Sequence, residues 1–182
     1  TYDTCANDNA VDGFKRGRIH GRMLEPPPHS VTKSGCRIMK GALVTGAGLR
    51  IGRALALALA ADGFFVFVHY KASAAGAKET VATIREAGGK ALAVRADLAS
   101  ARQAEGLVGK CRAPGVRLTC LVNSASLFKL DRAPTATAAD FDLHMAINLR
   151  APLLLAQALA RQLPADETGL VVNVLDQKLY NL

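Results

Sequence analysis

The fold is decided by residues 42–52, which read Ala-Leu-Val-Thr-Gly-Ala-Gly-Leu-Arg-Ile-Gly. The apolar run Ala42–Thr45 predicts a short buried strand that ends at Gly46. From Arg50 to Ala61 apolar residues recur at the i, i+3, i+4, i+7 and i+8 positions, which predicts a helix. A glycine-rich turn between a strand and a helix exposes the free N–H groups and partial positive charge of the helix N-terminus. The stretch therefore predicts a seat for a pyrophosphate.

Each glycine of this turn has a separate expected role. Gly46 permits a tight turn, Gly48 a close approach of the backbone to a ligand, and Gly52 close packing of helix against strand. Arg50 and Ile51 complete the turn and begin the helix. The alternative is a turn that is merely tight and binds nothing.

Working outward, strand and helix signals alternate along the rest of the chain. Further strands are expected at Phe64–His69, Ala91–Arg95, Leu118–Asn123 and Leu170–Leu175, and further helices at Ala74–Ala87, Ala101–Cys111 and Asp140–Gln162. Such alternation predicts an α/β fold with a Rossmann-type, doubly wound parallel sheet in a three-layer α/β/α arrangement.

The composition before residue 39 is different. Residues 1–38 contain the triple proline Pro26–Pro28 and show no periodicity, so we expect a disordered or non-native arm. A targeting peptide is disfavoured by the four acidic residues in this arm. Residues 39–182 are expected to form one domain that binds a dinucleotide.

Composition narrows the classes of protein. The chain has 182 residues, half of them apolar and 21% charged, which excludes a disordered or fibrous chain. No uninterrupted apolar run approaches 18 residues, so we expect no membrane-spanning helix. Four cysteines without close pairing or metal-ligand spacing predict free thiols, no metal site and a reducing, cytoplasmic location.

The net charge of +8 is spread over both parts of the chain. A nucleic-acid-binding protein usually concentrates its basic residues among aromatic ones, whereas this chain has no Trp and no dense basic run. We therefore expect no nucleic-acid partner. A mildly basic surface, or a basic cleft for a small anion, accounts for the excess.

The end of the second strand bears on the choice of cofactor. Residues 69–73 read His-Tyr-Lys-Ala-Ser and lack the acidic residue that would bind the ribose 2′-hydroxyl of NAD. Arg50, Lys71 and Ser73 offer groups for a 2′-phosphate instead, which favours NADP(H). The alternative is that these residues are solvated surface charges.

Together these residues resemble the short-chain dehydrogenase/reductase family. Residues 45–52 look like the family's T-G-x-x-x-G-x-G turn, with Arg50 in place of the middle glycine, a variant typical of the pteridine reductase branch. The resemblance implies an adenine contact at Asp97 and Leu98. It also implies that Asn123, Ser124, Ala125 and Ser126 form a cofactor-binding segment similar to the family's N-N-A-G motif, with serine at its second position.

The segment beginning His69-Tyr70 is similar to that of pteridine reductases, and the resemblance implies that His69 and Tyr70 contact the cofactor. On the substrate side, the resemblance implies that Phe128 stacks on a pterin ring. It implies catalytic roles for Asp176, where most of the family has Ser, and for Asn148 of the family's tetrad. Phe128 as a core residue and Asp176 as an ordinary turn residue remain the alternatives.

Asn148 also has a local physical argument. Pro152 lies four residues later and has no N–H, so the Asn148 carbonyl loses its usual helical donor. A freed carbonyl can hold an ordered water, and the resemblance implies such a water in a proton relay. The alternative is a simple kink in a long helix.

The family's Tyr-x-x-x-Lys pair is absent, because none of Tyr2, Tyr70 and Tyr180 has Lys four residues later. We expect the chain to be truncated at its C-terminus. The leading hypothesis is an NADPH-dependent reductase of a pterin- or dihydrofolate-like small molecule, homo-oligomeric at full length. The alternatives are a generic carbonyl or alcohol reductase and a catalytically inactive NADP-binding fragment.

Overall fold

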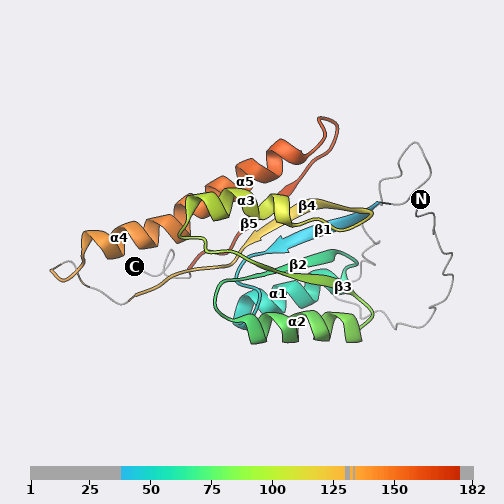
Figure 1. The fold of residues 1–182 in the computed structure, drawn as a ribbon, viewed down its shortest axis with the longest axis horizontal. Coiled ribbons are helices and arrows are strands. Elements are labelled where there is room, and N and C mark those ends of the chain that lie inside the picture. Colours follow the sequence, from blue (N-terminus) through green and yellow to red (C-terminus); the bar gives the residue numbers. More distant parts are fainter. Residues whose placement is uncertain (1–37, 130–131, 133, 177–182) are drawn as a thin grey trace, which may run out of the picture.

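The computed structural model describes residues 38–129, 132 and 134–176, so the predicted N-terminal arm up to residue 37 and Tyr180 lie outside the described residues. Its centre is a five-stranded parallel sheet in the order β3-β2-β1-β4-β5 (Figure 1). The strands are β1 (Met39–Val44), β2 (Phe65–Tyr70), β3 (Lys90–Arg95), β4 (Val116–Asn123) and β5 (Leu170–Asn173).

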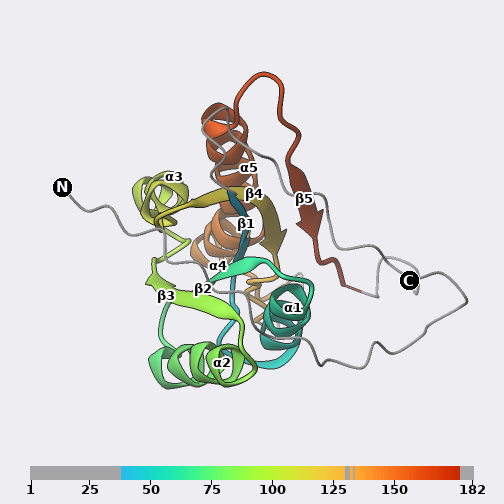
Figure 2. The same ribbon diagram turned by 90° about the vertical axis from the view of Figure 1, so that its right-hand side faces the viewer.

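Helices cover both faces of the sheet, which confirms the predicted three-layer α/β/α fold (Figure 2). The helices are α1 (Arg50–Ala61), α2 (Ala74–Glu86), α3 (Ala101–Lys110), α4 (Ala138–Met145), the π-helical turn η1 (Ala146–Arg150) and α5 (Ala151–Gln162). Helices α1 and α2 lie on one face, and α3 and α5 lie on the other.

Strand alternation explains the two layers. In β1, Leu43 points into the core shared with α3 and α5, whereas Ala42 and Val44 point into the core shared with α1 and α2. In β2, Phe67 and Val68 divide in the same way, and all five side chains are fully buried. Strands buried on both faces read as continuous apolar runs, as this sequence does.

The strand order fixes where a ligand can bind. After β3 the chain returns to pair β4 with β1, on the side opposite β2. Open α/β sheets bind ligands at this switch point, outside the carboxyl ends of the strands. The glycine turn after β1 and the segment after β4 therefore lie next to each other at the carboxyl ends of the strands.

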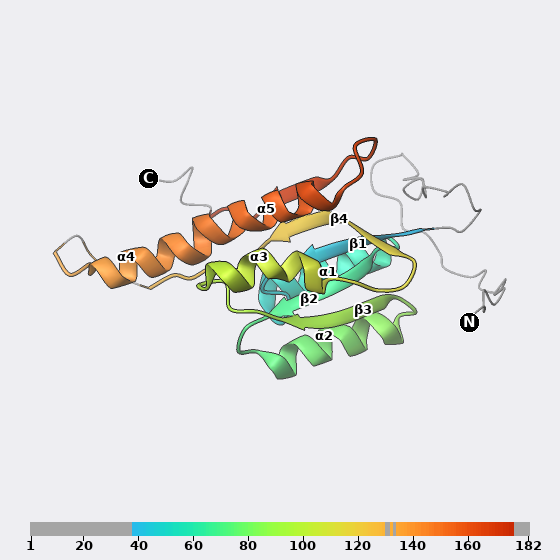
Figure 3. The ribbon, with the colours of Figure 1, turned by 45° about the horizontal axis from the view of Figure 1, so that its top comes forward.

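The C-terminal helix is longer and less regular than predicted. Helices α4, η1 and α5 run without a break over Ala138–Gln162, and α4 projects beyond the carboxyl ends of the strands (Figure 3). Among the described residues this is the one helix whose length (25 residues) and mean hydropathy (1.2) would allow it to cross a membrane. Counting uninterrupted apolar residues overlooked it because Asp142 and Arg150 interrupt the run. This property is weak evidence for a membrane, because it rests on length and composition alone. Leu155 and Leu159 pack in the core, and 28% of the most apolar stretch of the helix is buried.

Strand β5 forms one edge of the sheet in the described part of the chain. It ends at Asn173, two residues before the predicted end at Leu175, and all four of its residues are exposed. Asp176 therefore follows the strand instead of closing it.

Candidate nucleotide-binding site

The backbone of the glycine turn is held by hydrogen bonds to His69 of β2. Gly46 has φ +66° and donates its N–H to His69 Nδ1 at 3.2 Å, and Ala47 N–H donates to the His69 carbonyl at 2.9 Å. A side chain on Gly52 is impossible without a shift, because a Cβ there would lie 2.3 Å from the Gly46 carbonyl oxygen. The expected reasons for glycine at positions 46 and 52, a tight turn and close helix packing, are confirmed.

Gly48 owes its lack of a side chain to a different neighbour. A Cβ at this position would lie 2.8 Å from Ser73 Oγ and 3.2 Å from Ala77 N, both at the start of α2. The Gly48 carbonyl in turn fills the space beside Gly76. Packing of α2 against the turn thus leaves little room for a side chain at position 48, and the closeness of Gly48 to a ligand stays a prediction.

The amino end of α1 is suited to an anion. No side chain caps it at Leu49, and no acidic residue lies in its first turn. Arg50 is exposed and has φ +51°, the one non-glycine residue with positive φ among those described. A left-handed conformation costs an L-residue about 1–2 kcal/mol. Glycine at this position would avoid that cost, so the conformation of the backbone disfavours arginine here. Backbone strain of this kind is common at functional sites.

Thr45 joins this turn to the segment after β4. Its hydroxyl donates to the Val122 carbonyl at 3.3 Å and accepts the N–H groups of Ser124 and Ala125, each at 3.0 Å. Thr45 is itself buried. One side chain thereby sets the spacing between the two segments of the predicted cofactor site, a role that its place in the sequence motif did not reveal.

His69 serves the protein's own backbone. Its ring is buried, Nδ1 accepts from Gly46 N–H, and Nε2 therefore carries the proton donated to the Ala96 carbonyl at 3.2 Å. Burial lowers its pKa from 6.5 to about 4, against the opposing effects of the Ala96 carbonyl and Asp97. His69, expected to contact the cofactor, thus holds the glycine turn through Nδ1 and the residue that follows β3 through Nε2.

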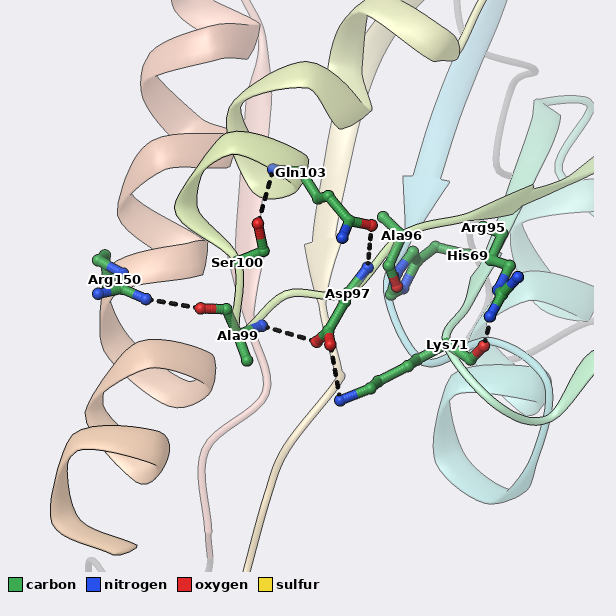
Figure 4. A network of polar contacts seen from close by, with 9 residues as sticks. All are labelled: His69, Lys71, Arg95, Ala96, Asp97, Ala99, Ser100, Gln103 and Arg150. Carbon is green, nitrogen blue, oxygen red and sulfur yellow. Dashed lines mark hydrogen bonds and ion pairs between the residues drawn. The ribbon is translucent and has the colours of Figure 1, made fainter. Parts of the chain in front are cut away.

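Lys71 and Asp97 form an ion pair at 2.9 Å between the ends of β2 and β3 (Figure 4). The hydrogen bond from Lys71 is the largest of the influences that lower the pKa of Asp97. Asp97 also accepts from Ala99 N–H at 3.0 Å, and its own N–H donates to Gln103 Oε1 at 2.9 Å. The ammonium predicted to meet a 2′-phosphate is thus held beside the residue predicted to meet adenine.

The other predicted cofactor residues lie around the same edge. Ile51 and Ser126 are exposed, whereas Tyr70 and Ser124 are half-buried. The Leu98 side chain is buried in the core shared with α3 and α5, which leaves only its backbone for a ligand. Ser73 occupies the N-cap position of α2 without capping the helix through its hydroxyl.

Asn123 ends β4 at the switch point and is 5% exposed. Its Nδ2 donates to Asn173 Oδ1 of β5 at 2.9 Å, while its own Oδ1 is buried without a hydrogen-bond partner. Asp176 is exposed three residues beyond the end of β5, the strand that pairs with β4. The described residues contain no cluster of three or more His, Cys, Asp or Glu side chains placed to bind a metal.

Asn148 lies in η1, just before Pro152. The proline was expected to disturb the helix, and the helix indeed widens to a π turn here. The Asn148 side chain holds Leu127 at two points, since Oδ1 accepts from its N–H at 2.9 Å and Nδ2 donates to its carbonyl at 2.8 Å. Asn148 thus positions the segment after β4, and the water at its carbonyl stays a prediction.

Comparison with known proteins agrees with this architecture. A sequence model of the short chain dehydrogenase family matches residues 40–177. An uncharacterized oxidoreductase of Methylorubrum extorquens is 40% identical over 135 residues, which are 74% of this chain and 54% of the relative. A 3-oxoacyl-[acyl-carrier-protein] reductase of Synechocystis is 34% identical over 133 residues, which are 73% of this chain and 54% of the relative.

Among solved structures, the FolM alternative dihydrofolate reductase 1 of Brucella canis, complexed with NADP, superposes with a TM-score of 0.73. It is 37% identical, and the match covers 79% of this chain and 56% of that one. The chain belongs to the short-chain dehydrogenase family. It spans about half the length of the curated relatives it matches.

Proposed function

We propose that this chain forms the NADP(H)-binding part of a reductase that acts on a pterin- or dihydrofolate-like small molecule. The observation that carries the proposal is Arg50, an exposed guanidinium held in a left-handed conformation at the uncapped amino end of α1. The NADP-complexed dihydrofolate reductase structure supports the choice of cofactor and of substrate class.

The residues present fit a phosphorylated dinucleotide. The space beside Gly46 and Gly52 is too tight for side chains, and the first turn of α1 offers N–H groups to a diphosphate. In this proposal the Arg50 guanidinium binds the 2′-phosphate, and Lys71 adds a second cation if it leaves Asp97. Release of Lys71 also frees a carboxylate oxygen of Asp97 to accept from the amino group of an adenine.

When bound, NADPH supplies a hydride and becomes NADP+. In the proposed reaction the hydride adds to the carbon of a C=N bond, and a proton adds to its nitrogen. In this proposal Asp176, which is exposed after β5, delivers that proton through water. Phe128 offers an exposed ring to a flat substrate.

A second candidate is reduction of a ketone, in which the proton adds to oxygen. The similarity to a 3-oxoacyl-[acyl-carrier-protein] reductase favours it. The third candidate, binding of NADP(H) without catalysis, follows from the absence of a Tyr-x-x-x-Lys pair in this chain. Reading the gene beyond Leu182 for that pair separates the enzyme from the inactive fragment.

The cofactor assignment is tested by titrating the chain with NADPH and NADH before and after Arg50→Gly. Loss of a charged hydrogen bond worth about 1.5–3 kcal/mol weakens NADPH binding by roughly 10- to 100-fold. NADH binding should change less than threefold, and the variant should stay folded because glycine accepts φ +51°. Arg112→Gly makes the same charge change at the far end of α3 and should leave both affinities unchanged. Equal losses for the two nucleotides refute the assignment.

The substrate class is tested by mixing the protein with NADPH and dihydrobiopterin, then with NADPH and a 3-oxoacyl thioester. Oxidation of NADPH with the pterin alone supports the first candidate, and oxidation with the thioester alone supports the second. Tight NADPH binding without oxidation in either mixture supports the inactive fragment.

A further inference from the structure

Three helix side chains, each one turn apart, hold the chain that leaves β4. Asn148 binds both main-chain groups of Leu127, as described above. One turn earlier, His144 Nε2 accepts the N–H of Lys129 at 3.1 Å. One turn earlier again, Asp140 Oδ1 accepts from Lys129 Nζ at 2.6 Å. Figure 3 shows the chain after β4 running beside α4.

The geometry fixes the proton on His144. Its Nδ1 lies 2.7 Å from the Asp140 carbonyl oxygen, which can only accept, so Nδ1 carries the hydrogen. Nε2 then presents its lone pair, which matches the donating N–H of Lys129. The neutral imidazole therefore donates to the helix backbone at Asp140 and accepts from the main chain at Lys129.

Phe128 lies between these two anchors. Its ring is 73% exposed, although the main chain on both sides of it is bound to the helix. Together with Ala136, Phe141 and His144 it lines a shallow hollow of about 240 Å³. An exposed phenylalanine on a mobile loop would lose its placement, whereas here both neighbouring peptide groups are fixed.

We propose that His144 is a positioning residue that fixes the main chain at Lys129 and so holds Phe128 in place for a flat, ring-containing substrate. The inference rests on the proposed function for the identity of that substrate. His144 itself contacts the chain after β4 and acts on the substrate only through it. Asn148 fixes the other side of Phe128, so the two helix residues act together.

The test compares His144→Leu with His144→Gln in the full chain. Leucine has similar bulk but no acceptor, whereas the amide oxygen of glutamine reaches the position of Nε2. The readouts are hydrogen exchange at the Lys129 amide, NADPH affinity, and dihydrobiopterin affinity in the presence of NADP+. A thermal melt of each variant checks that the fold is retained.

In His144→Leu we expect the Lys129 amide to exchange about fivefold faster and dihydrobiopterin to bind about fivefold more weakly, since one hydrogen bond is worth about 1 kcal/mol. NADPH affinity should not change, and His144→Gln should restore the other two values. Unchanged exchange in His144→Leu, or failure of His144→Gln to restore it, overturns the proposal. A wild type that protects Lys129 and binds NADPH but not dihydrobiopterin refutes the pterin substrate and leaves the anchoring by His144 in place.

Discussion

Acidification should destabilise the protein through His69. The folded state lowers the pKa of this imidazole from 6.5 to about 4, because burial disfavours the charged form. Protonation would also place a hydrogen on Nδ1, where the ring accepts the N–H of Gly46. Between pH 6.5 and pH 4 the unfolded chain therefore binds a proton at His69 that the folded chain does not.

The sign and size of the effect follow from that difference. The contribution of His69 to the free energy of unfolding is fully present above pH 6.5, falls as the pH is lowered, and levels off below about pH 4. Each pKa unit corresponds to about 1.4 kcal/mol, so the loss amounts to about 3 kcal/mol. That is a large part of the 5–15 kcal/mol over which domains are typically stable.

The assay is urea unfolding followed by circular dichroism at several pH values between 7 and 4. His69→Asn is the matched variant, because its amide oxygen can accept from Gly46 N–H but does not titrate. The wild type should lose about 3 kcal/mol more than His69→Asn across this range. The difference between the two curves removes the contribution of every other titrating group. Parallel curves would refute the assignment of His69 as a buried neutral acceptor.

Substitutions at three further positions test neighbouring contacts. Gly52→Ala should abolish tight NADPH binding and lower the melting temperature, because its Cβ would lie 2.3 Å from the Gly46 carbonyl oxygen; an unchanged melt and affinity would contradict the close packing. Thr45→Val should reduce the free energy of unfolding by about 2–3 kcal/mol, since two amide donors lose their acceptor, while Thr45→Ser should restore most of it in a urea titration. Lys71→Met should raise the pKa of Asp97, measured by NMR titration of the carboxylate, and an unmoved pKa would show that the ion pair does not form in solution.

The fold was predictable because each of its elements carries a local signal. Continuous apolar runs predicted buried strands such as β2, and the glycine spacing predicted the turn before α1, whose bounds match the prediction. Strand ends were less certain. Asn173 ends β5 two residues early because its partner β4 ends at Asn123, the residue in register with Asn173. At that end Val174 N–H still donates to the Asn123 carbonyl at 3.0 Å. Pro152 was the one residue in the sequence that indicated an irregularity near the π turn.

The site was harder to predict, because its key contacts join distant parts of the chain. The Thr45 hydroxyl forms hydrogen bonds with groups nearly 80 residues away in the sequence, so no local pattern predicts that it joins two segments of the site. The glycine spacing predicted a close approach of the backbone to a ligand at Gly48, and only the structure shows that the start of α2 packs against this position. Likewise His69 was recognised as important, while its burial and its two backbone partners depend on how β1, β2 and β3 assemble.

A crystal structure of the chain with NADPH tests the central claim most directly. We predict the diphosphate at the first turn of α1, between Gly46 and Gly52, with the 2′-phosphate within hydrogen-bonding distance of the Arg50 guanidinium. Density for the nucleotide at any other place, or a 2′-phosphate turned away from Arg50 into solvent, would contradict the account.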